Sequence, residues 1–329
     1  MRVGIVGVTG LVGRTFLQAL PLYGFEEAEV YGAASERSVG QRLPFRTGEL
    51  VVEPIEKLLE RDLNVVFFSA GASVSRTWAP RFVERGALVI DNSSAWRLEP
   101  DVPLVVPEVN PHTLGSARLI ANPNCSTIQL VVLLAPLAKA FGLERVVVST
   151  YQAVTGTGQK AVDRLLAERE GRFAGPSPYP HPIDLNCLPQ CDVFEAEGYT
   201  KEEWKIIRES RKILERPDLA ITATAVRVPV LGGHSESVNV VLCREASLEE
   251  VRRVLEEAPG LTLQDDPASS YYPMPRYVGG QDGVFVGRIR RDTSHPRGFN
   301  FWVVADNLRK GAATNALQIA QHVLAKTHA

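Results

Sequence analysis

The first third of the chain alternates short apolar runs with amphipathic segments. Four of the runs are rich in β-branched or aromatic residues and predict buried strands: 3–8, 29–34, 64–69 and 87–91. Helical patterns lie at 14–20 and 74–85. Strands that alternate with helices are typical of parallel crossover units, so this part predicts a Rossmann-type, doubly wound α/β sheet.

The pattern changes after about residue 122. The elements predicted beyond it are two helices, at 126–141 and 160–170, and five strands, at 145–152, 221–229, 237–243, 283–290 and 300–305. Because most of these strands follow one another without a helix between them, we expect an α+β domain with a mostly antiparallel or mixed sheet. A C-terminal helix is expected after Gly311, where apolar residues recur at three- and four-residue spacings.

Length and charge narrow the class of protein. The 329 residues suggest two domains at about 150 residues each. Lys and Arg total 36 and Asp and Glu total 38, which argues against a nucleic-acid partner. The longest apolar stretch, 130–138, is far shorter than the roughly 20 residues of a membrane span, so no membrane partner is expected. We expect a cytoplasmic protein whose four cysteines are reduced thiols.

A glycine-rich turn stands between the first strand and the first helix. Its glycines are Gly7, Gly10 and Gly13, in the segment GVTGLVG. Glycine permits a tight turn and lets the backbone approach a pyrophosphate, whose charge the helix N-terminus then binds. The spacing is a variant of the dinucleotide fingerprint and predicts a cofactor site. The alternative is a tight turn without a ligand.

The residues after the second strand bear on which dinucleotide binds. A carboxylate there would bind the ribose of NAD, and an arginine would bind the 2′-phosphate of NADP. Both Glu36 and Arg37 are present, and the hydroxyls of Ser35 and Ser38 favour NADP. NAD remains the open alternative.

Cys125 is the candidate nucleophile. It lies in NPNCST, directly before an apolar helix and among cap-type residues. A helix N-terminus can lower the pKa of a thiol from about 8.5 to about 3.5–7.5, and the resulting thiolate attacks carbonyl carbon. Cys187 and Cys191 lack a second ligand pair at metal-site spacing, and Cys243 lies within a strand, so these three are interpreted as structural and no metal is expected.

His234 is the candidate acid/base among six histidines. It stands in RVPVLGGHSE, between two strand-like runs, and its two glycines allow a substrate or the backbone to approach. Arg227, seven residues earlier, offers a planar fork for a carboxylate or phosphate. A loop histidine and a surface ion pair are the alternative interpretations.

Several segments together resemble the aspartate-semialdehyde dehydrogenase family. They are GVTGLVG, DNSSAWR (91–97), NPNCST, YQAVTGTG (151–158), RVPVLGGHSE, VGRIRRD (286–292) and DNLRKGAATNALQIA (306–320). The resemblance covers nearly the whole chain. It implies NADPH-dependent reductive dephosphorylation of β-aspartyl phosphate to aspartate semialdehyde, in the biosynthesis of lysine, methionine, threonine and diaminopimelate.

The resemblance also implies a role for individual residues. Cys125 would form an acyl thioester, His234 would act as acid/base, and Gln152 would orient the intermediate. Substrate and phosphate would be bound by Arg97, Asn124, Glu202, Lys205 and Arg227. The NADP(H) site would comprise Gly7, Thr9, Gly10, Leu11, Val12, Ser35, Arg37, Ser38, Ser69, Ala70, Gly71, Thr155, Gly156 and Asn307.

The family organisation implies an NADP-binding domain of residues 1–122 with 306–329, and a catalytic and dimerisation domain of residues 123–305. A homodimer is therefore expected. The nearest rival is an N-acetyl-γ-glutamyl-phosphate reductase, whose cysteine segment would resemble NPGCYPT and which would not need Glu202 for a substrate amine. A rival of another class is a non-catalytic NADP-binding sensor.

Overall fold

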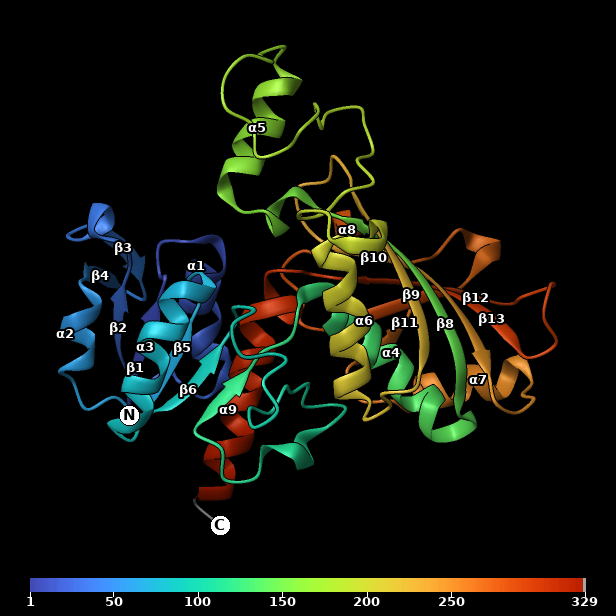
Figure 1. The fold of residues 1–329 in the computed structure, drawn as a ribbon, viewed down its shortest axis with the longest axis horizontal. Helices are drawn as coiled ribbons and strands as arrows, with labels where there is room; N and C mark the ends of the chain where they lie inside the picture. The colour runs from blue at the N-terminus through green and yellow to red at the C-terminus, as the bar shows by residue number, and fades with distance from the viewer. Residues whose placement is uncertain (328–329) are drawn as a thin grey trace. The chain divides into compact units, whose positions relative to one another are not determined.

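The computed structural model describes residues 1–327, which divide into two compact units. Unit 1 comprises Met1–Asn124 and the C-terminal segment that starts at Ala312, and unit 2 comprises Cys125–Gly311 (Figure 1). Each unit has a single large sheet.

The sheet of unit 1 has seven strands in the order β3-β4-β2-β1-β5-β6-β7. Their bounds are β1 (Arg2–Val6), β2 (Glu29–Ala33), β3 (Arg42–Phe45), β4 (Gly48–Glu53), β5 (Val65–Phe68), β6 (Leu88–Asp91) and β7 (Leu119–Ala121). All neighbours are parallel except β3 and β4. The six parallel strands follow the Rossmann order 3-2-1-4-5-6 when counted along the chain, which confirms the predicted doubly wound sheet.

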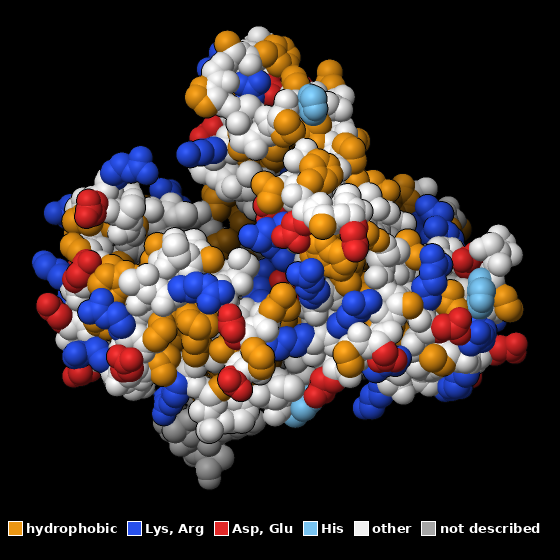
Figure 2. Space-filling model, in the orientation of Figure 1, with side chains coloured by type: hydrophobic (Ala, Val, Ile, Leu, Met, Phe, Trp, Pro, Cys, Tyr) orange, Lys and Arg blue, Asp and Glu red, His pale blue; other side chains and the backbone are white. Residues whose placement is uncertain are grey.

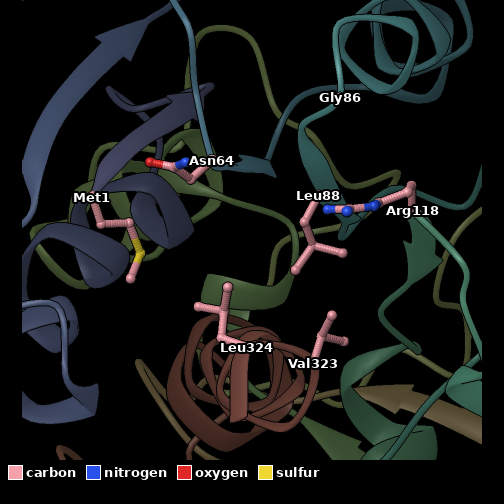
Figure 3. A pocket seen from close by; sticks show the side chains of 7 residues that line it. All are labelled: Met1, Asn64, Gly86, Leu88, Arg118, Val323 and Leu324. Carbon is pink, nitrogen blue, oxygen red and sulfur yellow. The ribbon is translucent and has the colours of Figure 1, made fainter. Parts of the chain in front are cut away.

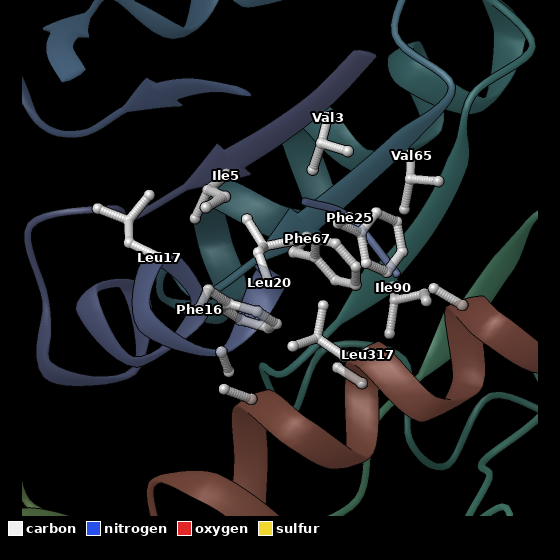
Figure 4. Packing of buried hydrophobic residues seen from close by; sticks show 14 of the residues in the cluster. Val3, Ile5, Phe16, Leu17, Leu20, Phe25, Val65, Phe67, Ile90 and Leu317 are labelled. Atoms are coloured by element: carbon white, nitrogen blue, oxygen red, sulfur yellow. The ribbon is translucent and has the colours of Figure 1, made fainter. Parts of the chain in front are cut away.

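Helices cover both faces of this sheet because alternate strand residues point to opposite sides. Val3, Ile5 and Phe67 pack against α1 (Leu11–Ala19) and α9 (Thr314–Thr327), as Figure 4 shows. The intervening residues, such as Val66 and Phe68, pack against α2 (Ile55–Leu59) and α3 (Ala72–Glu84). Short 3-10 turns lie at Leu20–Tyr23, Glu36–Ser38 and Pro111–Leu114.

The sheet of unit 2 has six strands in the order β11-β12-β13-β10-β8-β9. Their bounds are β8 (Leu143–Gln152), β9 (Ala220–Arg227), β10 (His234–Leu242), β11 (Leu261–Leu263), β12 (Val284–Arg291) and β13 (Gly298–Ala305). The central pairs are antiparallel, and β8 with β9 and β11 with β12 are parallel. The mixed α+β architecture predicted for this part is confirmed.

The longer helices of unit 2 are α4 (Cys125–Phe141), α5 (Gln159–Arg169), α6 (Lys201–Ile213) and α7 (Leu248–Glu256), and α8 (Pro275–Val278) is a single turn. Of these, α4, α6 and α7 pack against the sheet or against one another (Figure 1). Short turns lie at Val154–Gly156, Ala196–Gly198, Pro267–Ser269 and Arg309–Ala313.

The sequence patterns missed several elements and misplaced one residue. They did not predict α2, α6, α7, α8 or the strands β3, β4, β7 and β11. The sequence patterns predict His234 between two strands, but it is the first residue of β10. The prediction is wrong because the apolar run that marks this strand starts three or four residues after the first residue of the strand.

No helix within residues 1–327 is both long and apolar enough to cross a membrane. Figure 2 shows basic and acidic side chains interspersed over the visible face, in keeping with the net charge of −2.

Candidate active site

The cofactor residues predicted in unit 1 lie at one edge of its sheet. Gly7–Val12 follow β1, Ser35–Ser38 follow β2, and Ser69–Gly71 follow β5. These three strands are adjacent and parallel, so the structure brings the three segments together at their carboxyl ends. This edge is where doubly wound sheets bind their ligands.

Two positions in the first turn require glycine because main-chain atoms lie where a Cβ would be. Gly7 has a φ of +87°, and a Cβ there would lie 2.4 Å from the Ser69 carbonyl oxygen. A Cβ on Gly13 would lie 2.2 Å from the Gly7 carbonyl oxygen. Gly10, the N-cap of α1, has 3.4 Å to the nearest such atom. The turn therefore holds the N-terminus of α1 close to β1, an arrangement that fits a dinucleotide pyrophosphate.

A pocket of about 520 Å³ in unit 1 lies at the opposite edge of the sheet (Figure 3). It is lined by Met1, Asn64, Gly86, Leu88, Arg118, Val323 and Leu324. The first five of these precede or begin β1, β5, β6 and β7, so the pocket faces the amino ends of the strands. It is therefore separate from the turns that are expected to bind the cofactor.

In unit 2, three predicted site residues form a row at one end of the sheet. Gln152 ends β8, Arg227 ends β9 and pairs with Gln152, and His234 begins β10. The register of β10 on β8 pairs Ser235 with Tyr151, which sets His234 beside Gln152. All three side chains are buried, with exposures of 1% for Gln152, 6% for Arg227 and 0% for His234.

Hydrogen bonds to Ala153 hold His234 and Arg227. The Ala153 N–H donates to His234 Nδ1 at 3.0 Å, and Arg227 Nη1 donates to the Ala153 carbonyl oxygen at 2.7 Å. With Nδ1 accepting, the proton of the neutral imidazole is assigned to Nε2. His234 Nε2 and Arg227 Nε are both buried, and neither has a hydrogen-bond partner among residues 1–327.

Cys125 is the first residue of α4 and is partly exposed, which confirms its predicted position at a helix N-terminus. The neighbouring Ser126 Oγ accepts a hydrogen bond from Gln152 Nε2 at 3.0 Å. The same Nε2 donates to Glu202 Oε1 at 3.2 Å. Through Gln152 and Ala153, the structure thus brings the start of α4 together with His234, Arg227 and Glu202.

Burial and nearby charges set the protonation of this site. Burial, with a contribution from the charge of Arg227, lowers the pKa of His234 to about 3, so the imidazole is neutral at neutral pH. Burial opposes the charge of Lys205, but Glu202 and Asp192 outweigh it, and the pKa of the lysine is raised. Lys205 Nζ donates to Asp192 at 2.8 Å and to Glu202 at 3.1 Å.

The turn after β8 packs tightly onto these groups. A Cβ on Gly156 would lie 2.8 Å from Arg227 Nη1 and 3.0 Å from His234 Nε2. Asn307 exchanges hydrogen bonds with the Thr155 hydroxyl and accepts one from the Gly233 N–H at 3.0 Å. In unit 2, Asn307 therefore anchors the turns that carry Gly156 and His234.

Two residues expected to bind substrate belong to unit 1. Arg97 is 8% exposed, and it donates from Nε to the Asn122 carbonyl oxygen at 3.0 Å and from Nη2 to the Asn92 carbonyl oxygen at 2.7 Å. These bonds fix the guanidinium within unit 1. Asn124 is also buried and is the last residue before the boundary.

The sequence reasoning missed two features of the site in unit 2. The main-chain groups of Ala153 carry no sequence signal. Glu236 is wholly buried two residues after His234, and an acidic residue inside an apolar strand is a signal that could have drawn attention to it. Cys191, which the sequence analysis interprets as structural, is buried, and burial raises the pKa of its thiol to about 12, so it stays protonated. Within residues 1–327, no three His, Cys, Asp or Glu side chains cluster as metal ligands.

Comparisons with known proteins show the family to which the chain belongs. The models described as the NAD binding domain and the dimerisation domain of semialdehyde dehydrogenase match residues 2–117 and 134–310. An aspartate-semialdehyde dehydrogenase of Aquifex aeolicus is 50% identical to the chain over 329 residues, covering 97% of each protein. The chain belongs to the aspartate-semialdehyde dehydrogenase family. Membership confirms the predicted resemblance and makes the chain an oxidoreductase with a nicotinamide cofactor.

Two solved structures of the aspartate-semialdehyde dehydrogenase family extend the likeness to the whole fold. Aspartate semialdehyde dehydrogenase II of Vibrio cholerae, complexed with ASA, has a TM-score of 0.94 at 42% identity and 98% coverage of each chain. The Candida albicans enzyme with NADP has a TM-score of 0.77 at 28% identity and 99% coverage of each chain.

Proposed function

We propose that the chain converts β-aspartyl phosphate to aspartate semialdehyde and phosphate in amino-acid biosynthesis, with Cys125 as the nucleophile. One observation carries this proposal: His234, Gln152 and Arg227 form a row at one end of the unit 2 sheet. A hydrogen bond from Gln152 to Ser126 connects this row to the first turn of α4. A thiolate at a helix N-terminus is stabilised by the helix dipole, and it attacks an activated acyl carbon.

In the first step the Cys125 sulfur bonds to the acyl carbon, the bond from that carbon to the phosphate oxygen breaks, and phosphate leaves. The product is a thioester on Cys125. A nicotinamide cofactor, when bound, supplies the hydride that reduces this thioester. The carbon–sulfur bond then breaks, which returns the thiolate and releases the aldehyde.

Within unit 2, the proposed role of His234 is to donate from Nε2, the nitrogen that has no partner in the described part of the chain. Its hydrogen bond would stabilise negative charge first on the sulfur and then on the oxygen of the reduced thioester. Arg227 Nε would bind the substrate carboxylate, and Gln152 would keep the reacting carbon in place. Glu202 would bind the substrate amino group, and Lys205 would bind phosphate.

The proposed residues of unit 1 serve the cofactor and the phosphate. Gly7 to Val12 and the Ser69–Gly71 turn would hold the dinucleotide, and Arg97 would bind phosphate. We propose NADP as the preferred cofactor because Ser35 and Arg37 are exposed just after β2, where a 2′-phosphate would lie. The Candida albicans relative has NADP in its structure. A higher kcat/KM for NADP than for NAD is the expected result.

We also propose a homodimer formed through the open face of the unit 2 sheet. Residues 134–310 match a model described as a dimerisation domain. On the face away from α4, β8 and β9 present side chains that no helix of unit 2 buries, including Tyr151, Thr224 and Val226. A sheet face that no helix covers can pack against the same face of a second copy of the chain.

The proposed reaction is tested by measuring NADPH formation from aspartate semialdehyde. We expect the wild type to require both phosphate and NADP, and Cys125→Ser to lose activity while it still binds cofactor. N-acetylglutamate semialdehyde is the comparison substrate, because its blocked amine cannot bind Glu202 as an ammonium would. Preference for the acetylated substrate would favour the rival reductase. Cofactor binding without turnover of either substrate would favour the sensor.

A further inference from the structure

A second layer of buried polar side chains lies behind the site of unit 2. Gln129 is four residues after Cys125 on α4, Thr150 is two before Gln152 on β8, and Glu236 is two after His234 on β10. These spacings point each side chain to the same side of its element as the site residue. Their exposures are 1%, 0% and 0%.

The strand register places these three residues together. Glu236 pairs with Thr150 on β8 and with Val303 on β13, and α4 packs against this part of the sheet. The Gln129 amide interacts with the Glu236 carboxyl and partly offsets the rise in its pKa that burial causes. We call Gln129, Thr150 and Glu236 the buried polar layer.

Every residue of the buried polar layer has polar side-chain atoms without a hydrogen-bond partner among residues 1–327. Both carboxyl oxygens of Glu236, both amide atoms of Gln129 and the Thr150 hydroxyl are buried and have no hydrogen-bond partner within residues 1–327. Such groups are rare in native proteins, and each one requires an explanation. Active-site hydrogen bonds are often long in ligand-free enzymes and shorten when the site is assembled.

The residues that pair with Glu236 or act on its carboxyl are uncharged. The residues that face it from the three elements packed against it are Gln129, Thr150 and Val303, and burial raises the pKa of the carboxyl well above its usual value. Burial therefore favours the neutral acid over the carboxylate. A protonated carboxyl both donates and accepts, which matches an amide and a hydroxyl as partners.

We propose that Glu236 is a positioning residue that, through Gln129 and Thr150, fixes the placement of Cys125 and Gln152 relative to His234. Its polar neighbours Gln129 and Thr150 lie on α4, which begins at Cys125, and on β8, which ends at Gln152. The proposal rests on the proposed function, because the reaction that this placement serves is thioester formation at Cys125.

Three variants test the proposal. Glu236→Gln keeps a neutral group that donates and accepts, so we expect kcat within about threefold of wild type. Glu236→Met has similar length but no hydrogen bonds, so we expect kcat to fall on the order of 10- to 100-fold, with KM within about threefold. Ser235→Ala is the matched control, because Ser235 is equally buried on the same strand but points to the opposite face. We expect it to retain wild-type kcat.

A readout that needs neither substrate nor cofactor accompanies the kinetics. The rate of Cys125 alkylation by iodoacetamide is measured against pH by mass spectrometry, which separates it from the exposed Cys187 and Cys243. We expect the profile to shift in Glu236→Met and to match wild type in Glu236→Gln. If Glu236→Met does not fold, Gln129→Met removes the polar neighbour on α4 and is expected to reproduce the loss of kcat and the shifted profile.

Two results would overturn the proposal. One is a folded Glu236→Met, or Gln129→Met in its place, with wild-type kcat and a wild-type alkylation profile. The other is a Glu236→Gln as impaired as Glu236→Met, which would show that an ionised carboxylate is needed. If the wild type does not turn over aspartate semialdehyde, the proposed function fails, and the alkylation profiles still decide whether Glu236 positions Cys125.

Discussion

His234 shows how burial and one main-chain contact set the chemistry of a side chain. Its ring has no exposed surface, and the Ala153 N–H occupies Nδ1. Burial removes the hydration that would stabilise an imidazolium, and the nearby Arg227 guanidinium disfavours it further. The ring is therefore a neutral donor at Nε2.

Replacing His234 with Asn should change how stability depends on pH. The pKa of the imidazole is about 3 in the folded chain against 6.5 as its ordinary value, so only the unfolded chain takes up this proton between those limits. The histidine's contribution to stability is complete above pH 6.5 and is lost as pH falls. As pH falls from 6.5 towards 3, the unfolding free energy of the wild type should decrease more steeply than that of His234→Asn. The expected difference is about 1.4 kcal/mol for each pH unit. Urea unfolding from pH 4 to 7 measures the difference, and parallel curves would refute this assignment.

Site residues with a local sequence signal could be predicted, and those defined by contacts between distant parts of the chain could not. Cys125 was predictable because its cap-type neighbours and the apolar helix after it are local features. Gln152 and Glu202 came only from the family resemblance, since their contact joins residues fifty positions apart. Glu236 was missed because its burial depends on α4 and β13, which no local pattern places over β10.

The same contrast holds among helices and strands. The doubly wound sheet was predictable because its strands are continuous apolar runs. Helix α6 was missed although it begins with a capping box, in which Thr200 accepts from the Glu203 N–H and Glu203 accepts from the Thr200 N–H. Its polar surface masks the buried stripe that contains Ile206 and Ile213. That helix carries Glu202 and Lys205, so the sequence patterns placed neither of these two expected site residues on an element.

Substituting Gly13 with Ala should disturb the junction of β1 and α1. The added Cβ would lie 2.2 Å from the Gly7 carbonyl oxygen and 2.7 Å from Val8 Cα, both main-chain atoms that cannot move independently. We expect a loss of about 1–3 kcal/mol in unfolding free energy and weaker NADP binding. Denaturant unfolding and a fluorescence titration measure the two effects.

Gly10→Ala is the control for stability in that experiment. Its Cβ would have 3.4 Å to the nearest main-chain atom, so the unfolding free energy should change much less. Equal stability losses in both variants would show that close packing at Gly13 is not what the turn requires.

The division into two units assigns different tasks to different parts of the chain. The residues expected to bind the dinucleotide lie mainly in unit 1, and Cys125 is the first residue of unit 2. Unit 2 also presents the open sheet face proposed as a dimer interface. Ring contact between Tyr151 and Trp302, with centroids 5.4 Å apart, lies on that face.

Thr224→Arg should weaken the proposed dimer. Thr224 is exposed on β9, and a buried, unpaired arginine at the interface would be costly. Sedimentation velocity should show a dimer for wild type and a shift towards monomer for the variant. Thr47→Arg, on the exposed turn between β3 and β4 of unit 1, should remain dimeric. A monomeric wild type, or an intact Thr224→Arg dimer, would contradict the proposed interface.

A burst experiment tests the thioester on Cys125 most directly. Enzyme is mixed with aspartate semialdehyde and NADP in the absence of phosphate, and NADPH absorbance is followed. We expect close to one NADPH per active site, an acyl adduct on Cys125 in the mass spectrum, and steady turnover once phosphate is added. Cys125→Ser should give neither burst nor adduct. Steady NADPH formation by Cys125→Ser, or a wild-type burst with no adduct on Cys125, would contradict covalent catalysis by this residue.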